Sequence, residues 1–172
     1  LFRGTPLLIQ LYIIYYGIAQ IDGIQDTFWW TIFREPFYPA LLAFVLNTAA
    51  YTTEILRGAI EATPHGEIEA AKAYGMSWAR RVRRIVMPSA ARRALQAYSN
   101  EVIFMVHASA IASVVTIVDL TGAARDIYSR FYAPFDAFIA VALMYMALTF
   151  TIVFCFRLLE KRMLRHLKPA NG

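Results

Sequence analysis

The stretch EAAKAYGMSWARRVRRIVMP, residues 69–88, is the most informative part of this chain. It is polar and helix-forming, and long apolar segments lie on either side of it. The positions that give it a recognisable order are Glu69, Ala70, Ala71, Gly75, Ile85 and Pro88. A membrane protein that carries a folded, charged elbow between apolar segments is expected to present that elbow to a partner.

The composition indicates a membrane protein. The 172 residues are 59% hydrophobic and only 17% charged, whereas soluble domains average about 25% charged residues. The single cysteine, Cys155, lies in an apolar run and cannot form an internal disulfide. Since no internal repeat or domain boundary is visible, we predict one all-α transmembrane domain over residues 1–172.

Four apolar segments are long enough, or nearly so, to cross a bilayer as helices. They are residues 6–21, 37–56, 98–118 and 135–156. A crossing needs about 20 residues, so the first segment is short. Helices are predicted because backbone groups in lipid must be paired within their segment and the alternation of barrel strands is absent.

Basic residues define the orientation. Most of the 17 lysines and arginines fall on one side of the predicted membrane: Arg3, Arg57, Lys72, Arg80, Arg81, Arg83, Arg84, Arg92, Arg93, Arg157, Lys161, Arg162, Arg165 and Lys168. The other side holds Arg34, Arg125 and Arg130. Basic residues in short loops stay cytoplasmic, so we predict a cytoplasmic N-terminus, elbow and C-terminus. This bias accounts for the net charge of +5 without a nucleic-acid partner.

The elbow itself has the start and stop signals of two short helices. Thr63 and Pro64 are predicted to begin the first as hydroxyl cap and first helical residue. Gly75 is predicted to end it in a left-handed conformation. Ser77 is then expected to cap the second helix, and Pro88 to mark the start of the next long one. On the opposite side, a short helix over residues 119–128 is expected, capped by Asp119 or Thr121.

Six polar residues within the predicted spans are candidates for a translocation path: Asn47, Tyr51, Glu54, Asn100, Glu101 and His107. Helical spacing places the first three on one face, and Asn100 and His107 on another. Interhelical pairing is the alternative role. We favour the path for Glu101 and a packing role for His107, and leave both roles open for Glu54. The other histidines lie far away in sequence, so no metal site is expected.

The residues alone leave the role of the elbow open between docking a protein and resting on anionic lipid headgroups. The spacing from Glu69 through Gly75 and Ile85 to Pro88, however, resembles the EAA loop of ATP-binding-cassette importer permeases of the type I kind. Further stretches resemble polar amino acid permeases, at residues 3–11, 47–60, 99–101 and 119–120. The sequence at residues 64–71 and 124–127 most resembles that of the M-type permease subunits that transport histidine, lysine, arginine and ornithine, or octopine and nopaline.

This resemblance implies a multi-pass subunit of the bacterial inner membrane with five spans, of which four are visible here and one is expected to precede Leu1. It implies translocation of polar, basic amino acids or opines by alternating access. The implied partners are a homologous second permease subunit as a heterodimer, two ATPase subunits bound through residues 63–88, and a periplasmic substrate-binding protein. Because the chain has no phosphate-binding loop, no cofactor is expected on it, and ATP-Mg is expected on the ATPase; the chain is not itself an enzyme. The alternative function is a scaffold or passive channel anchored at the lipid surface.

The arginines of residues 80–84 serve as orientation signals in this interpretation. Replacing each one singly with alanine should then leave uptake nearly unchanged, because the remaining charges preserve the bias. Uptake into membrane vesicles measures this, and a large loss from one replacement would reveal a specific contact.

Overall fold

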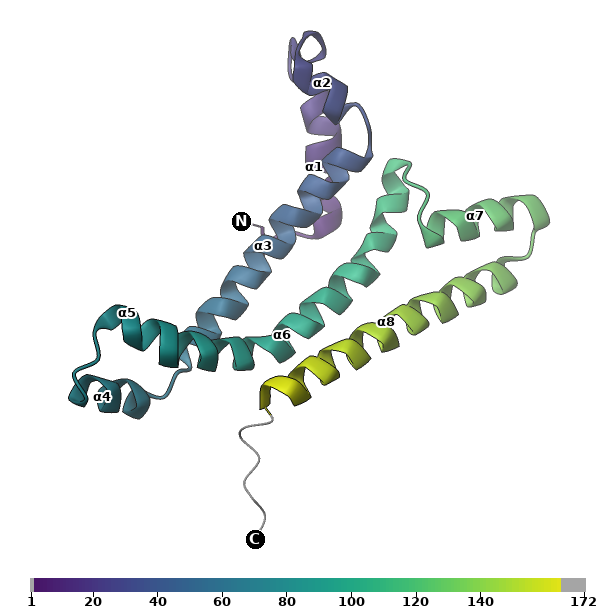
Figure 1. The fold of residues 1–172 in the computed structure, drawn as a ribbon. Helices are drawn as coiled ribbons and strands as arrows, with labels where there is room; N and C mark the ends of the chain where they lie inside the picture. Colours follow the sequence, from purple (N-terminus) through teal and green to yellow (C-terminus); the bar gives the residue numbers. More distant parts are fainter. Residues whose placement is uncertain (1, 165–172) are drawn as a thin grey trace. The chain divides into compact units, whose positions relative to one another are not determined.

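The computed structural model describes residues 2–164, and every regular element in that range is helical (Figure 1). This confirms the predicted all-α class. The elements are α1 (Leu7–Ala19), η1 (Ile24–Asp26), α2 (Phe28–Phe33), α3 (Phe37–Glu61), α4 (His65–Ala73), α5 (Trp78–Arg81), η2 (Val82–Val86), α6 (Met87–Ala108), η3 (Ser109–Val115), α7 (Leu120–Phe131) and α8 (Pro134–Leu164). The predicted tail residues Arg165 and Lys168 lie outside the described residues.

Three helical stretches are long and apolar enough to cross a membrane: Phe37–Glu61, Trp78–Val115 and Pro134–Met163. The predicted spans 37–56 and 135–156 lie within two of them, and the predicted span 98–118 overlaps Trp78–Val115 but extends beyond Val115. The remaining apolar helix, α1, has 13 residues and is therefore only about 20 Å long. The prediction of four spans is thus met by three long helices and a shorter one, because the helix of the first segment ends at Ala19, just before Gln20 and Gly23.

The third predicted span also begins earlier than expected. Pro88 was predicted to mark the start of the next long helix, and α6 does begin at Met87, although α5, η2 and α6 follow one another as one helical stretch. In a regular helix the Pro88 ring would clash with the Arg84 carbonyl. The widened π turn of η2 lies immediately before Pro88, and such turns relieve local clashes of this kind.

The chain divides into two compact units. The first comprises residues up to Tyr51 and Ile103–Phe150, and the second comprises Thr52–Val102 and residues from Thr151. The core of the first unit is formed by Leu11, Ala40, Ala43 and Val115, which are at most 1% exposed. Partly buried aromatic and branched side chains surround them. This core therefore joins α1, α3 and η3.

The core of the second unit is built from small residues. Ala59 of α3 lies against Ala90 and Ala94 of α6, with Ile55 beside them. Small side chains permit close approach of two helix backbones. The last turns of α3 and the first turns of α6 are consequently packed together at the base of the elbow.

Asp119 caps α7, which confirms the first of the two predicted caps, Asp119 and Thr121. One carboxylate oxygen accepts a hydrogen bond from the Gly122 amide at 2.8 Å. The other accepts a hydrogen bond from the Tyr145 hydroxyl at 3.2 Å. A single side chain thus begins α7 and ties it to α8.

Candidate functional site

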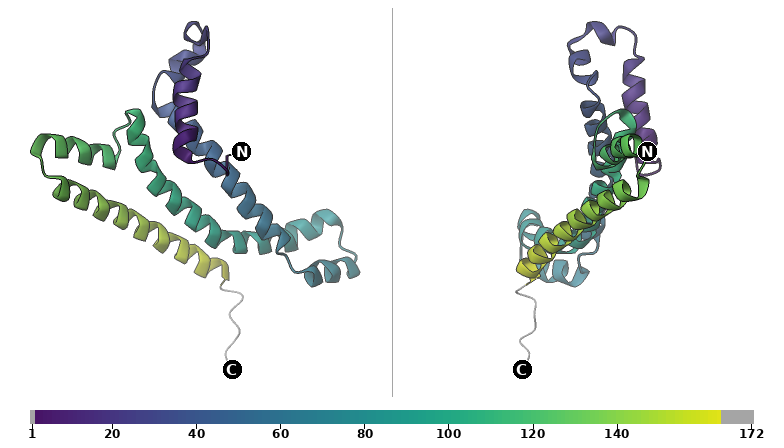
Figure 2. Two further views of the ribbon diagram at one scale, coloured as in Figure 1. Left: turned by 180° about the vertical axis from the view of Figure 1, so that it is seen from behind. Right: turned by 90° about the vertical axis from the view of Figure 1, so that its right-hand side faces the viewer.

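The first elbow helix ends as the sequence predicts. Gly75 adopts φ +70°, its amide donates to the Lys72 carbonyl at 2.9 Å, and the Met76 amide donates to the Ala71 carbonyl at 3.1 Å. This pair of bonds is the Schellman arrangement, in which a left-handed residue lets the chain leave the helix with its last carbonyls paired. Figures 1 and 2 show α4 and α5 next to each other at this turn.

The two alanines of the elbow have different environments. Ala71 is 5% exposed, and the helix α4 to which it belongs contacts η2. Glu69 and Ala70 are exposed, and Tyr74 at the end of the helix is 88% exposed. The predicted small face is therefore divided: Ala71 allows the elbow to close on itself, whereas Ala70 is accessible from outside.

The predicted side-chain caps of the two elbow helices, Thr63 and Ser77, are wrong, because neither hydroxyl makes a capping hydrogen bond. Thr63 is 3% exposed and does not cap α4, which begins after Pro64 without a side-chain cap. Its hydroxyl instead accepts a hydrogen bond from Arg93 of α6 at 2.9 Å. Ser77 occupies the predicted cap position of α5, but its hydroxyl makes no capping bond there.

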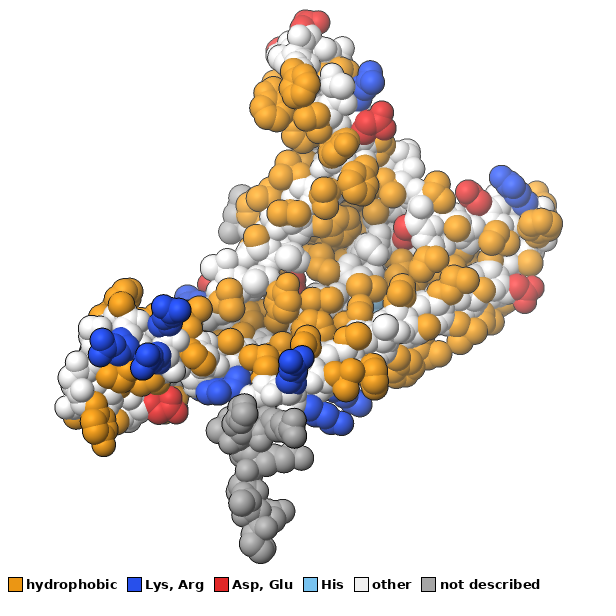
Figure 3. All heavy atoms as spheres, in the orientation of Figure 1, with side chains coloured by type: hydrophobic (Ala, Val, Ile, Leu, Met, Phe, Trp, Pro, Cys, Tyr) orange, Lys and Arg blue, Asp and Glu red, His pale blue; other side chains and the backbone are white. Residues whose placement is uncertain are grey.

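The basic cluster of the elbow is largely exposed. Arg80, Arg83 and Arg84 are exposed, and Figure 3 shows Lys and Arg side chains gathered over the region of α4 and α5. Arg81 differs, because its guanidinium donates to the Met76 carbonyl at 2.9 Å. Of the four arginines, Arg81 is therefore the one whose contact fixes the elbow.

Two of the predicted path residues lie in the first unit on α3. The Asn47 side-chain amide donates to the Gln10 side-chain carbonyl at 3.0 Å, and both residues are buried. Gln10 in turn donates to the backbone of Phe2 at 2.6 Å and to the Thr5 hydroxyl at 2.8 Å. Asn47 thus joins α3 to α1. The Tyr51 ring lies 5.7 Å from the Arg3 guanidinium, a cation–π distance.

Two further candidates, Glu54 and His107, contact other side chains. Glu54 forms an ion pair with Arg57 at 2.6 Å, one turn along α3, which is the pairing alternative left open for it. The His107 ring lies 3.0 Å from the Thr149 hydroxyl and edge-on to Tyr145. This agrees with the predicted packing role of His107.

Glu101 and Asn100 differ in burial although they are neighbours on α6. Glu101 is 8% exposed, whereas Asn100 is exposed. A carboxylate so far buried within an apolar span is costly and is a marker of functional sites in membrane proteins. Of the six candidates, Glu101 is the buried ionisable one.

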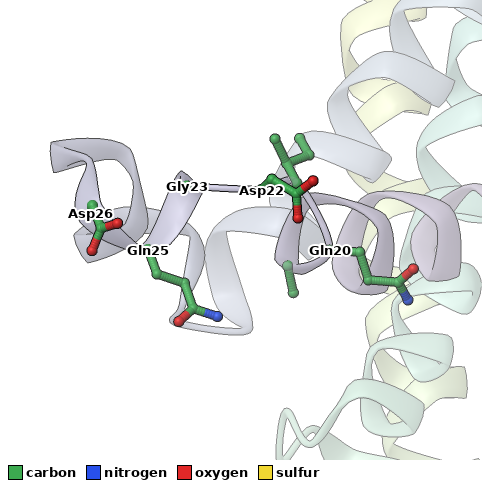
Figure 4. Close-up of a pocket in the computed structure, with 7 residues that line it drawn as sticks. Gln20, Asp22, Gly23, Gln25 and Asp26 are labelled. Atoms are coloured by element: carbon green, nitrogen blue, oxygen red, sulfur yellow. The ribbon is translucent and has the colours of Figure 1, made fainter.

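A polar hollow of about 530 Å³ lies in the turn after α1, lined by residues 19–23, 25 and 26. Figure 4 shows the side chains of Gln20, Asp22, Gln25 and Asp26 around it. All its lining comes from one short stretch of chain, and none of the predicted path residues takes part. The hollow is therefore a feature of the loop and not of the predicted path.

Sequence reasoning missed two residues that organise these sites. Gln10 could have been noticed as an amide side chain enclosed by apolar residues of the first segment, a position that requires a polar partner. Arg93 was counted only as part of the charge bias. No local signal distinguishes it from Arg92, because its acceptors lie 30 or more residues away.

Comparison with known proteins gives consistent matches over the chain. The family of binding-protein-dependent transport system inner membrane components matches residues 1–165. The histidine/lysine/arginine/ornithine transport system permease protein HisM of Escherichia coli (strain K12) is 48% identical over 99% of this chain and 72% of the relative. The nopaline transport system permease protein NocM of Agrobacterium fabrum is 45% identical over 99% of this chain and 71% of the relative. A solved structure, described as an amino acid ABC transporter with histidines, has a TM-score of 0.81 at 37% identity and covers 94% of this chain and 71% of that one.

Long apolar helices, an exposed charged elbow and these matches define a polytopic transport subunit. The chain belongs to the family of binding-protein-dependent transport system inner membrane components. It is the permease subunit of an amino acid ABC importer, and ATP hydrolysis resides in a separate component. A passive scaffold, the alternative considered from the sequence, is thereby set aside.

The φ of +70° at Gly75 predicts a specific cost of substitution. Gly75→Ala should destabilise the permease by about 1 kcal/mol, because a side chain disfavours this backbone conformation. A Cβ atom would meet nothing within 4 Å at either Gly75 or Gly66, so crowding does not contribute. Thermal unfolding of the purified permease measures the effect.

Gly66→Ala is the matched control. Gly66 lies within α4 and has no left-handed φ, so alanine there should raise stability slightly. Equal stabilisation by both substitutions would contradict the role assigned to the Gly75 conformation.

Proposed function

We propose that the elbow, residues 63–88, is the surface through which this permease binds its ATPase subunits and receives the force that drives transport. The observation that carries this proposal is the exposed edge of α4, where Glu69, Ala70 and Tyr74 project from a helix fixed by its own Schellman turn. An exposed aromatic beside a small residue and a carboxylate is suited to docking in a groove.

The proposed arrangement places the elbow in the cytoplasm, where the positive-inside rule puts basic loops. The short helix α1 is proposed as a fourth crossing and one further span as preceding it. We propose a bacterial inner-membrane subunit with a cytoplasmic C-terminus, paired with a homologous permease chain. Two ATPase subunits carrying ATP-Mg and a periplasmic binding protein complete the transporter.

The proposed substrates are basic amino acids or opines. HisM is a permease for histidine, lysine, arginine and ornithine, and NocM is a permease for nopaline. These substrates share a cationic side chain or a guanidinium, which a buried carboxylate can pair with. Glu101 is the proposed partner, and Asn100 beside it is the proposed second contact. Alternating access by rigid movement of α6 would open this path to one side at a time.

Ala70→Glu tests the docking surface. The new charge lies on the exposed edge of α4, so it should abolish co-purification of the ATPase while leaving the permease in the membrane. Co-purification from detergent-solubilised membranes measures this.

Lys72→Glu is the control for that substitution. Residue 72 is also exposed and lies about 200° around the helix from residue 70, so the same new side chain there should preserve ATPase binding. Normal ATPase binding by the Ala70→Glu permease would argue against docking through this edge.

Glu101→Gln tests the substrate contact without changing side-chain volume. Uptake of cationic amino acids in reconstituted vesicles should fall at least about tenfold, since a buried charge-assisted bond is worth about 1.5–3 kcal/mol. ATPase association should remain intact. A panel of histidine, arginine, lysine, ornithine, octopine and nopaline identifies the substrate.

Glu54→Gln serves as the comparison, because Glu54 pairs with Arg57 within its own helix. It should leave the substrate preference unchanged. Wild-type uptake kinetics in the Glu101→Gln permease would remove Glu101 from the path.

A further inference from the structure

At the end of α3 the Ala59 carbonyl does not receive its usual hydrogen bond from the backbone amide four residues later. In a regular helix the Thr63 amide would bond to the Ala59 carbonyl, but it donates to the Ile60 carbonyl at 3.0 Å. Arg93 of α6 takes up the Ala59 carbonyl, to which its Nε donates at 3.2 Å. The end of α3 is therefore completed by a residue of another helix.

The same guanidinium binds the connector that leads into α4. Arg93 Nη2 donates to the Thr63 hydroxyl at 2.9 Å. Nε and Nη2 project from one edge of a rigid, planar group, so an arginine can make both bonds at once. A lysine carries a single ammonium and cannot reproduce this fork.

The two bonds of Arg93 are partly sheltered from water, since Arg93 itself is half-buried. Thr63 is 3% exposed, and Ala90 and Ala94 on either side of Arg93 in α6 are 3% and 5% exposed. Hydrogen bonds in such a low-dielectric setting are stronger than on the surface, and leaving the partners unpaired is costly. Thr63 and Arg93 therefore hold each other in one geometry.

We propose that Arg93 is a positioning residue that couples the elbow to the membrane-crossing helix α6. The elbow joins α6 through the chain at its C-terminal end, by way of α5 and η2. At its N-terminal end Arg93 holds Thr63, which lies two residues before the start of α4. With both ends fixed, a push on α4 moves α6. Without the two hydrogen bonds of Arg93, α4 turns about residues 62–64 and the force on it is not passed to α6.

This inference rests on the proposed function and is tested in the assembled transporter. The permease, its partner permease, the ATPase subunits and the binding protein are reconstituted in vesicles, and the amino acid transported per ATP hydrolysed is measured. Arg93→Lys and Thr63→Val should each lower this ratio at least about fivefold, the lower end of typical coupling effects. The double variant should be no worse than the worse single one, because both remove one interaction.

Three measurements separate coupling from general damage. Thr63→Ser keeps the hydroxyl and should retain the wild-type ratio. Arg92→Lys is the matched control, since Arg92 donates to neither Ala59 nor Thr63 among the described contacts. ATPase co-purification should be normal in every variant, because the exposed edge of α4 is untouched.

A wild-type ratio in either Arg93→Lys or Thr63→Val would overturn the inference. If Arg93→Lys fails to accumulate, Thr63→Val decides, because it replaces one hydroxyl at nearly constant volume. Loss of ATPase binding in these variants, with normal binding by the unmodified permease, would also overturn the inference, since Arg93 would then shape the docking surface instead. Absence of ATPase binding by the unmodified permease would contradict the proposed function itself.

Discussion

Pairing of backbone polar groups is the constraint on which this structure depends. In an apolar environment an unpaired carbonyl or amide costs several kcal/mol, so a helix can end or bend only where other groups complete it. At Gly75 the backbone completes itself through a left-handed turn. At the end of α3 the completion comes from Arg93, and before Pro88 it comes from a widened turn. The glycine turn, the Arg93 hydrogen bond and the π turn together define where the helices of the elbow end and bend.

The polar residues of the long helices divide into two kinds. Asn47, Glu54 and His107 have partners that account for them structurally. Glu101 stands apart by its chemistry, because it is an ionisable side chain that is buried within a long apolar stretch. A substrate path in this subunit is consequently better sought around α6 than along the Asn47 face of α3.

The sequence was a good guide wherever short-range chemistry decides the structure. The long spans of α3 and α8, the glycine turn at residue 75 and the Asp119 cap all follow from local patterns. It was a poor guide where a distant residue competes. Thr63 looked like a cap, but a guanidinium 30 positions away in the chain claims its hydroxyl. The burial of Ala71 and the exposure of Ala70 beside it likewise follow from no local pattern.

The π turn of Val82–Val86 has a consequence for how this family can diverge. Such a turn holds one residue more than the α-helical turn that it replaces. Loss of one residue there would restore regular winding and leave the helical turns on either side facing nearly the same way, whereas loss of one residue from a regular α-helical turn rotates everything beyond it by about 100°. A single-codon deletion within these five positions would therefore keep the direction of the elbow, and the same deletion in the regular turns that follow would change it.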